Sequence, residues 1–222
     1  MSDKPRFAVL LSGCGVFDGA EVTETVTTLL AIDRQGGAYR CFAPDIPQLH
    51  VIDHKSGQPM EGETRNVLVE AARIPRGAID DVAVFDPSEF DALILPGGFG
   101  AAKNFCTFAV DGPDCAVDEN VEAAIKAAHT AGLPIGALCI APAVIARVLG
   151  DVTVTIGSDA GVAEGIGAMG GTHKTTTHAE IVVDEANKLV TSPCYMLDAT
   201  VSQIADGADN TVRALMGMIG KG

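Results

Sequence analysis

A nine-residue stretch, Pro134 to Pro142, constrains the fold and the chemistry of this chain more than any other segment. It joins a short apolar run, residues 135–138, to an apolar helical pattern that starts at Ala141, and Cys139 lies between them. A strand, a sharp turn and a helix with a reactive residue on the turn make a nucleophile elbow. Such a turn strains the backbone of the reactive residue, so its neighbours must be small. Ala137 and Ala141 meet this requirement.

The helix that follows Cys139 favours a reactive thiol. Its N-terminus directs free N–H groups and the positive end of the helix dipole toward the sulfur, which predicts a lowered thiol pKa. Pro142 fits the first turn of this helix, because it lacks an N–H that would have no partner there. The alternative is a buried core thiol at the end of a strand, since free cysteine is often buried. These residues alone leave both interpretations open.

Composition and charge limit the class of protein. A chain of 222 residues, 47% of them hydrophobic, suits one α/β domain over residues 1–222. The net charge of −14 and the absence of a basic cluster argue against nucleic acid and against anionic membrane surfaces as partners. No apolar run reaches the length that spans a membrane.

The cysteines and the N-terminus predict the compartment. The six cysteines include no Cys-x-x-Cys pair, so zinc and redox-pair motifs are absent and free thiols are expected. Met1 to Arg6 shows no signal or transit pattern before the first predicted strand. We therefore expect a cytoplasmic protein without a metal site.

Hydrophobic runs predict a parallel sheet. The apolar runs at residues 7–11 and 39–43 flank a helical pattern over residues 21–35, which makes a β-α-β unit and hence parallel strands. The other predicted segments are a strand at 91–95, short strands at 48–53 and 152–156, helices at 66–73 and 117–130, a loop at 104–113, a hairpin over 180–191, and two C-terminal helices at 196–205 and 210–219.

A functional site in such a sheet lies beyond the carboxyl ends of the strands. The loops at residues 12–24 and 97–104 and the elbow at Cys139 are expected to meet there. Glu21 and Glu24 share one face of the predicted helix, and one of them could exchange a proton with the thiol. The alternative is that both acids complement the helix dipole, and this is the interpretation that we favour for Glu21.

Glycines and histidines offer further candidates. Gly97 and Gly98 could direct backbone N–H groups toward the sulfur and form an oxyanion site with the N–H of Ile140, although an ordinary glycine-rich turn explains them as well. The glycines of the first loop, Gly13, Gly15 and Gly19, do not match the spacing of the dinucleotide fingerprint Gly-x-Gly-x-x-Gly. The pair His178-Ala-Glu180 has the form that orients a cysteine nucleophile in amidotransferases, but it falls at the start of a predicted strand.

Three motifs together resemble one superfamily. They are Gly19-Ala-Glu-Val-Thr-Glu24-Thr-Val, Leu95-Pro-Gly-Gly-Phe-Gly100 and Ala137-Leu-Cys139-Ile-Ala-Pro142. They resemble the active-site motifs of the PfpI-like, class I glutamine amidotransferase-like superfamily. Within it the chain is similar to the ElbB family, which is associated with isoprenoid biosynthesis and glyoxalase-type chemistry. The blocks that carry this finer resemblance lie at residues 11–19, 63–67, 97–104 and 155–159.

The resemblance implies a flavodoxin-like three-layer sandwich, a homodimer and no cofactor. It implies that Cys139 is the nucleophile, with Glu24 beside it and the amides of Gly98 and Ile140 as the oxyanion site. Gly97, Asn104 and Asp159 are the predicted pocket residues. Many superfamily members carry a histidine about twenty residues after the nucleophile, whereas this chain has Gly157-Ser-Asp159 there. This departure argues against protease or glutaminase activity.

The leading hypothesis is a slow, cofactor-independent glyoxalase that converts glyoxal or methylglyoxal to the hydroxy acid through a hemithioacetal on Cys139. A thiol-based stress sensor or regulatory protein linked to isoprenoid biosynthesis is the first alternative, with oxidation of Cys139 as its chemistry. An amidase that releases ammonia from glutamine is the second.

Overall fold

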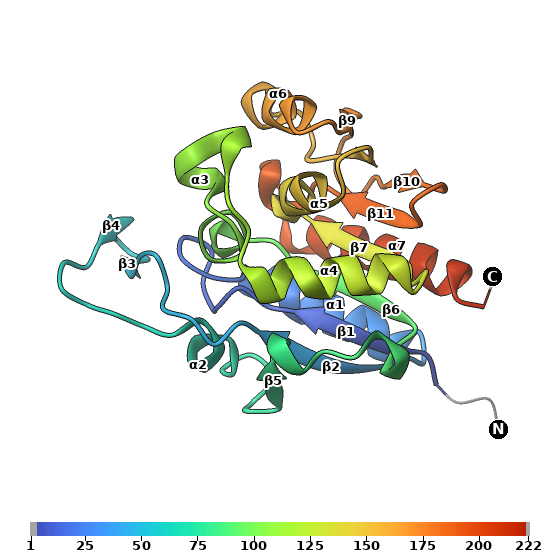
Figure 1. The fold of residues 1–222 in the computed structure, drawn as a ribbon, viewed down its shortest axis with the longest axis horizontal. Coiled ribbons are helices and arrows are strands. Elements are labelled where there is room, and N and C mark those ends of the chain that lie inside the picture. The colour runs from blue at the N-terminus through green and yellow to red at the C-terminus, as the bar shows by residue number, and fades with distance from the viewer. Residues whose placement is uncertain (1–3, 221–222) are drawn as a thin grey trace.

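A seven-stranded sheet forms the centre of the molecule (Figure 1). The computed structural model describes residues 4–220, so the two ends of the predicted domain and part of the Met1 to Arg6 stretch lie outside the described residues. The strand order is β10-β11-β7-β6-β1-β2-β5, and only β10 runs antiparallel to its neighbour within this sheet. The strands are β1 Arg6–Leu10, β2 Ala38–Ala43, β5 Ile79–Asp81, β6 Ala92–Leu95, β7 Ile135–Leu138, β10 Val182–Asp184 and β11 Leu189–Ser192.

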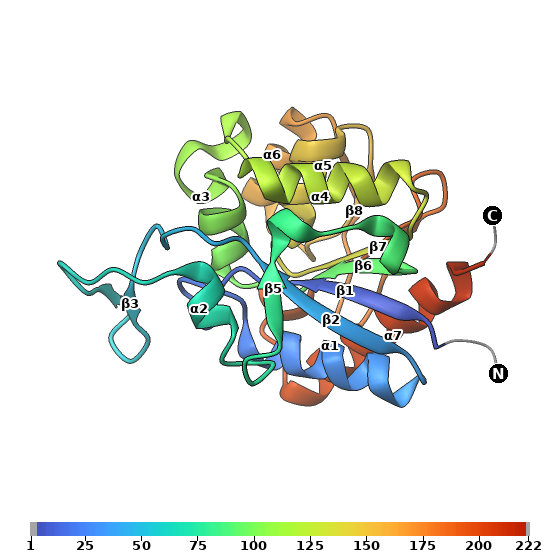
Figure 2. The same cartoon turned by 60° about the horizontal axis from the view of Figure 1, so that its bottom comes forward.

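Helices cover both faces of the sheet (Figure 2). One face packs against α1 Val22–Arg34, α2 Val67–Ala71 and α7 Val201–Met218. The other packs against α4 Glu119–Thr130 and α5 Ala141–Leu149, and α3 Phe108–Asp111 and α6 Ala160–Ala168 lie outside α5. The predicted flavodoxin-like three-layer sandwich with a mainly parallel sheet is therefore confirmed.

The central strands are apolar because both of their faces are covered. Residues 7–10 of β1 are at most 1% exposed, and all four residues of β6 are equally buried. Continuous burial of this kind requires a run of apolar residues rather than an alternating pattern, as expected for parallel strands between two helical layers. The runs that predicted β1, β2 and β6 reflect this burial directly.

Two short pairs of strands lie outside the main sheet. The antiparallel pair β3 Ile52–Asp53 and β4 Gln58–Pro59 projects from the body of the molecule at the left of Figure 1. The parallel pair β8 Thr153–Val154 and β9 Thr172–His173 lies beside β10, where the Asp184 carboxylate accepts a hydrogen bond from the Thr153 N–H at 2.7 Å. The predicted strands at 48–53 and 152–156 are thus shorter than expected.

Several predicted segments were wrong because glycine and polar residues interrupt the pattern. The expected loop at 104–113 holds the end of a π-helical turn, Ala101–Phe105, and then α3. The two expected C-terminal helices are one helix, α7, in which Gly207 allows close approach to the Ser192 side chain. Helix α6 was missed: its glycines hide the pattern, and Gly165 leaves room for the Phe108 ring.

None of the helices within residues 4–220 combines the length and the apolar character that crossing a membrane requires.

Candidate active site

Cys139 occupies a strained turn between β7 and α5. Its φ of 58° lies in the left-handed region, which costs a residue with a side chain about 1–3 kcal/mol. The turn is held by a hydrogen bond from the Cys139 N–H to the Ser192 carbonyl at 2.9 Å. The Cys139 side chain is only 6% exposed, and the flanking Ala137 and Ala141 are fully buried. This geometry agrees with the predicted elbow, and its small neighbours leave room for the turn.

Gly97 brings the backbone of the loop after β6 against the thiol. A Cβ on Gly97 would lie 2.3 Å from the Cys139 Cβ, 2.7 Å from the Glu24 Oε2 atom and 2.8 Å from the Leu138 carbonyl. Since these distances are far below van der Waals contact and include backbone, only glycine fits at this position. The absence of a side chain at Gly97 thus allows Cys139 and Glu24 to pack closely against its backbone.

Replacement of this glycine should destabilise the fold. We expect Gly97→Ala to lower the free energy of unfolding by about 3 kcal/mol, because overpacking at a rigid contact cannot be relieved by a side-chain rotation. Gly167→Ala is the matched control: its Cβ meets no atom within 4 Å, and alanine in the exposed helix α6 should add up to ~1 kcal/mol. Urea denaturation of both variants measures the difference, and equal stabilities would show that the described packing is wrong.

Glu24 lies in the first turn of α1 and is completely buried. Its Oε2 accepts a hydrogen bond from the Gly97 N–H and its Oε1 accepts one from the Tyr195 N–H, both at 3.0 Å. Burial raises the pKa of the Glu24 carboxyl from 4.5 to about 8, and the nearby charge of Glu21 adds to the rise. At neutral pH this carboxyl group is therefore mostly protonated.

Glu21 caps helix α1 rather than reaching the thiol. Its carboxylate accepts a hydrogen bond from the Glu24 N–H at 2.6 Å, in the position of an N-cap residue. Burial raises the pKa of Glu21, and bonds from the N–H groups of the first turn oppose that rise. The capping role that we favoured for Glu21 from the sequence agrees with this contact.

Cys139 and Glu24 form a coupled pair. Both side chains lie against Gly97, where a Cβ would lie 2.3 Å from the Cys139 Cβ and 2.7 Å from the Glu24 Oε2 atom, and burial and the charge of Glu24 raise the pKa of the Cys139 thiol well above its ordinary value. The nearby N–H groups of Gly98 and Ile140 oppose this rise in the pKa. The predicted lowering of the thiol pKa was thus wrong: desolvation and a neighbouring acid outweigh the dipole of α5.

The loops bring the predicted oxyanion donors to one place. Gly98 has a φ of 97°, and a Cβ there would lie 2.4 Å from the Glu21 nitrogen, so only glycine fits at this turn beside Cys139. The N–H of Ile140 comes from the start of α5. Both N–H groups lie beside Cys139, where a carbonyl carbon attacked by the thiol would place its oxygen.

A cavity of about 300 Å³ opens onto Cys139. Apolar and aromatic side chains make up most of its wall, namely Val16, Phe99, Ile140, Val162, Tyr195 and Met196. Gly98, Cys139 and Asp159 complete the lining. The Asp159 side chain also caps α6 by accepting a hydrogen bond from the Val162 N–H at 2.9 Å. A larger hollow of about 720 Å³ lies beside α7, but we place the site at the smaller one because only that cavity contains Cys139.

Two of the predicted pocket residues do not line this cavity. Gly97 lies behind Cys139, as its contacts with Glu24 show. Asn104 is 6% exposed, and its amide holds three backbone groups: the carbonyls of Ser12 and Asp18 and the N–H of Leu49. Asn104 therefore fixes the loop after β1 instead of facing the cavity, because its position in the π-helical turn points its amide toward that loop.

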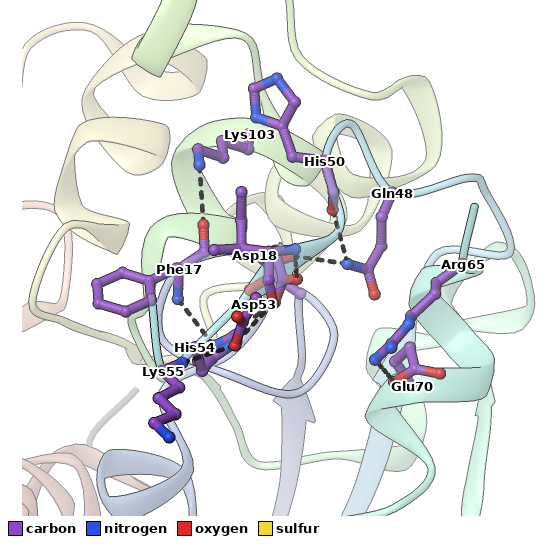
Figure 3. A network of polar contacts seen from close by, with 12 residues as sticks. Phe17, Asp18, Gln48, His50, Asp53, His54, Lys55, Arg65, Glu70 and Lys103 are labelled. Carbon is purple, nitrogen blue, oxygen red and sulfur yellow. Dashed lines mark hydrogen bonds and ion pairs between the residues drawn. The ribbon is translucent and has the colours of Figure 1, made fainter. Parts of the chain in front are cut away.

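The arm that carries β3 and β4, residues 52–59, contacts the loop after β1 (Figure 3). The buried Asp18 carboxylate accepts a hydrogen bond from the Ile52 N–H at 2.7 Å, and the His54 ring lies 3.7 Å from its other oxygen. Lys103 donates to the Phe17 carbonyl at 2.8 Å, as Figure 3 shows. Val16, next to these residues, reaches the cavity wall. The arm and Lys103 thus position one side of the cavity.

Sequence reasoning missed Asp18, Val16 and Tyr195. Tyr195 follows β11, which is parallel to β7, so its loop leaves the same edge of the sheet as Cys139. A rule that places sites at the carboxyl ends of parallel strands would have included this loop, but β11 was treated only as half of a hairpin. No sequence signal distinguished Asp18 from an ordinary loop acid.

The histidine pair lies elsewhere. His178 contacts the Asp198 carbonyl at 2.9 Å and Glu180 accepts from the Thr177 N–H, so the two do not orient Cys139. Both line the larger hollow beside α7. Within residues 4–220, no three side chains of histidine, cysteine, aspartate and glutamate are placed to hold a metal ion.

Comparison with known proteins assigns the family. The chain is 49% identical to the human protein named glutamine amidotransferase-like class 1 domain-containing protein 3, mitochondrial, over 97% of this chain and 84% of that protein. It is 45% identical to the rat ES1 protein homolog, mitochondrial, over 98% of this chain and 85% of that protein. The chain belongs to the ES1 family of glutamine amidotransferase-like proteins.

Solved structures agree with this ES1-family assignment. An isoprenoid biosynthesis protein with an amidotransferase-like domain from Ehrlichia chaffeensis superposes with a TM-score of 0.91 at 36% identity, covering 96% of this chain and 99% of that one. Proteins of the DJ-1 superfamily at 16% to 19% identity share the fold alone. No family model matches the chain. The predicted superfamily is confirmed, and the finer assignment to ElbB stays a prediction.

The prediction of a cytoplasmic location was wrong. The human, rat and zebrafish ES1-family relatives are all named mitochondrial. An acidic composition and free thiols suit any aqueous compartment that keeps thiols reduced, so they do not distinguish the cytoplasm from the mitochondrion.

Proposed function

We propose that this ES1-family protein is a slow, cofactor-independent glyoxalase that acts through Cys139. One observation carries the proposal: a buried carboxyl group, Glu24, whose pKa is raised to about 8 lies beside a thiol, Cys139, that lines a cavity. A group that titrates near neutral pH can both accept and donate a proton during a reaction. A thiol beside such a group can add to a carbonyl carbon.

The reaction needs no external oxidant. The Cys139 sulfur bonds to the aldehyde carbon, the π electrons of the carbonyl move to its oxygen, and the thiol proton passes by way of Glu24 to that oxygen. The Glu24 carboxylate then removes the hydrogen of the same carbon as a proton, the C–H electron pair forms a carbon–carbon double bond, and the neighbouring carbonyl oxygen takes up a proton, which gives an enediol. A proton then adds to the neighbouring carbon while the hydroxyl on the sulfur-bearing carbon loses its proton and becomes a carbonyl. The former aldehyde carbon is thereby oxidised to a thioester while its neighbour is reduced to an alcohol. Water hydrolyses the thioester and frees the hydroxy acid and the thiol.

Protonation limits the rate of this reaction. With a pKa of about 8, roughly a tenth of Glu24 is ionised at pH 7, and the thiol itself is protonated. We therefore expect slow turnover at pH 7 that rises as the pH approaches 8. The N–H groups of Gly98 and Ile140 would hold the oxygen of the adduct.

The alternatives receive less support. A sensor whose chemistry is oxidation of Cys139 needs a thiolate, and burial of this thiol opposes its ionisation. A glutamine-hydrolysing enzyme needs a cation for the carboxylate of glutamine, and the described residues that line the cavity include no lysine, arginine or histidine. The homodimer that the resemblance implies stays a prediction.

Turnover in heavy water tests the proposed reaction. Purified protein with methylglyoxal in D₂O should produce lactate that carries solvent deuterium on the alcohol carbon, because the transferred hydrogen travels as a proton. Proton and deuterium NMR measure both the amount of product and its labelling. Lactate without deuterium on the alcohol carbon would show that the transferred hydrogen does not exchange with solvent, contrary to this expectation, and lactate formed only at the rate of protein-free buffer would contradict the proposal.

A further inference from the structure

The cavity over Cys139 is built for an apolar group. Beyond the thiol and Gly98, its wall consists of Val16, Phe99, Ile140, Val162, Tyr195 and Met196 together with Asp159. At about 300 Å³ the cavity is at the lower end of the ~300–1,000 Å³ that small-molecule sites occupy. Glyoxal has no substituent that such a wall could bury, so most of this apolar surface would be left in contact with water.

Phe99 marks the open side of the cavity. Phe99 is 49% exposed even though its backbone is held by a hydrogen bond from the Phe99 N–H to the Val16 carbonyl at 2.8 Å. The Lys103 ammonium lies 5.6 Å from the ring centre and donates to the Phe17 carbonyl, and Phe99 lines the cavity whereas Lys103 does not. A bound group that covered this exposed ring would gain about 25 cal/mol for each Å² of apolar surface removed from water.

The charge around the cavity disfavours anions. Asp159 is an exposed carboxylate on the lining, and among the lining residues within 4–220 there is no lysine, arginine or histidine to oppose it. Glu24 adds a second negative charge behind Cys139 whenever it ionises. The net charge of −14 acts in the same direction over the whole molecule.

We propose that the carbonyl compound accepted by this site is uncharged and carries an aryl or branched alkyl substituent that packs against Phe99, Val162 and Met196. Simple glyoxal and anionic oxo acids are then poor substrates. This inference rests on the proposed addition of Cys139 to a carbonyl carbon. It names the substrate class of that reaction and makes Phe99 and Asp159 residues that determine specificity.

Three alkylating ketones that differ in one substituent test the preference of the cavity for an apolar group, and they require no turnover. Bromoacetone, 2-bromoacetophenone and bromopyruvate all react by forming a bond from sulfur to carbon and releasing bromide, and they differ only in a methyl, phenyl or carboxylate group. The rate of modification at Cys139, measured by peptide mass spectrometry, is divided by the rate with N-acetylcysteine. This ratio removes the intrinsic reactivity of each reagent and leaves the contribution of the cavity.

The corrected rate of Cys139 modification by 2-bromoacetophenone should exceed that by bromoacetone by about tenfold or more. A preference of this size is in the range that a buried apolar group gives in an enzyme pocket. Bromopyruvate should fall below bromoacetone. Phe99→Ala should remove most of the phenyl preference, and Val84→Ala, which truncates a 60% exposed side chain outside the cavity, should keep it. Asp159→Asn, which retains a cap for α6, should raise the relative rate of bromopyruvate.

The inference would be overturned if the corrected rates of 2-bromoacetophenone and bromoacetone were about equal. It would also be overturned if the preference for the phenyl reagent survived in Phe99→Ala. Turnover of phenylglyoxal and methylglyoxal is measured alongside. If neither is converted while the phenyl preference at Cys139 persists, the proposed glyoxalase reaction fails and the assigned cavity chemistry stands. If both are converted and the corrected ratio is near one, the inference fails by itself.

Discussion

Between pH 4.5 and pH 8 the wild-type protein should lose roughly 4 kcal/mol of unfolding free energy relative to Glu24→Gln. The native structure keeps Glu24 protonated until the pH approaches 8, whereas the same carboxyl group in the unfolded chain releases its proton near 4.5. Over this interval the native state binds more protons than the unfolded state, so stability falls as the pH rises. The size follows from ~1.4 kcal/mol for each pH unit.

The two stability curves should cross. Both oxygens of Glu24 accept backbone N–H groups, from Gly97 and from Tyr195, and a glutamine side chain offers only one acceptor oxygen. Glu24→Gln therefore leaves one buried N–H without a partner, which costs about 1–3 kcal/mol at every pH. The variant should be less stable than wild type at pH 4.5 and more stable above pH 8.

Urea denaturation at half-unit steps from pH 4.5 to pH 9 measures this difference, because all other titrating groups are common to both proteins. Asp53→Asn serves as a control for an exposed acid: its carboxylate is outside the site, and the pKa of Asp53 is lowered by a hydrogen bond from Ser56. Because this variant keeps Glu24, its stability should fall with pH as that of wild type does, and the difference between wild type and Asp53→Asn should stay constant between pH 4.5 and 8. A constant difference between wild type and Glu24→Gln would mean that Glu24 ionises normally in the folded protein.

The sequence was sufficient to predict the central strands and the elbow because both depend on local patterns, whereas the edge strand β5 was not predicted. Continuous apolar runs mark β1, β2 and β6, and the small residues around Cys139 mark the turn. Helix α6 and the continuity of α7 could not be predicted, since their glycines serve contacts with residues distant in the chain: Gly165 with Phe108, and Gly207 with Ser192.

The candidate site was predictable in its residues more than in its electrostatics. Glu24, Gly98 and Ile140 surround Cys139 as expected. The direction of the thiol pKa was wrong, because burial depends on how four separate segments close over the sulfur, and no local pattern reports that closure. Tyr195 was missed for the same reason, since its amide reaches Glu24 from a residue 171 positions away in the sequence.

Cys139→Ala should reduce the conversion of methylglyoxal to the rate in buffer, a loss on the order of 10³-fold or more. The thiol forms the bond to substrate in the proposed reaction, and alanine offers no atom that could replace it. The elbow should persist, because alanine at this left-handed position meets the same backbone constraint as cysteine. Circular dichroism and urea denaturation would verify that the variant is folded. Cys14→Ser, which changes a partly exposed thiol outside the cavity lining, should keep wild-type turnover.

Turnover of methylglyoxal by wild type and Cys139→Ala, measured in one assay at pH 8, tests most directly whether Cys139 is the reactive group of this protein. The result that we predict is formation of the hydroxy acid by wild type and by Cys14→Ser, with none above the buffer rate from Cys139→Ala. Equal turnover by wild type and folded Cys139→Ala would contradict the proposed role of the elbow cysteine.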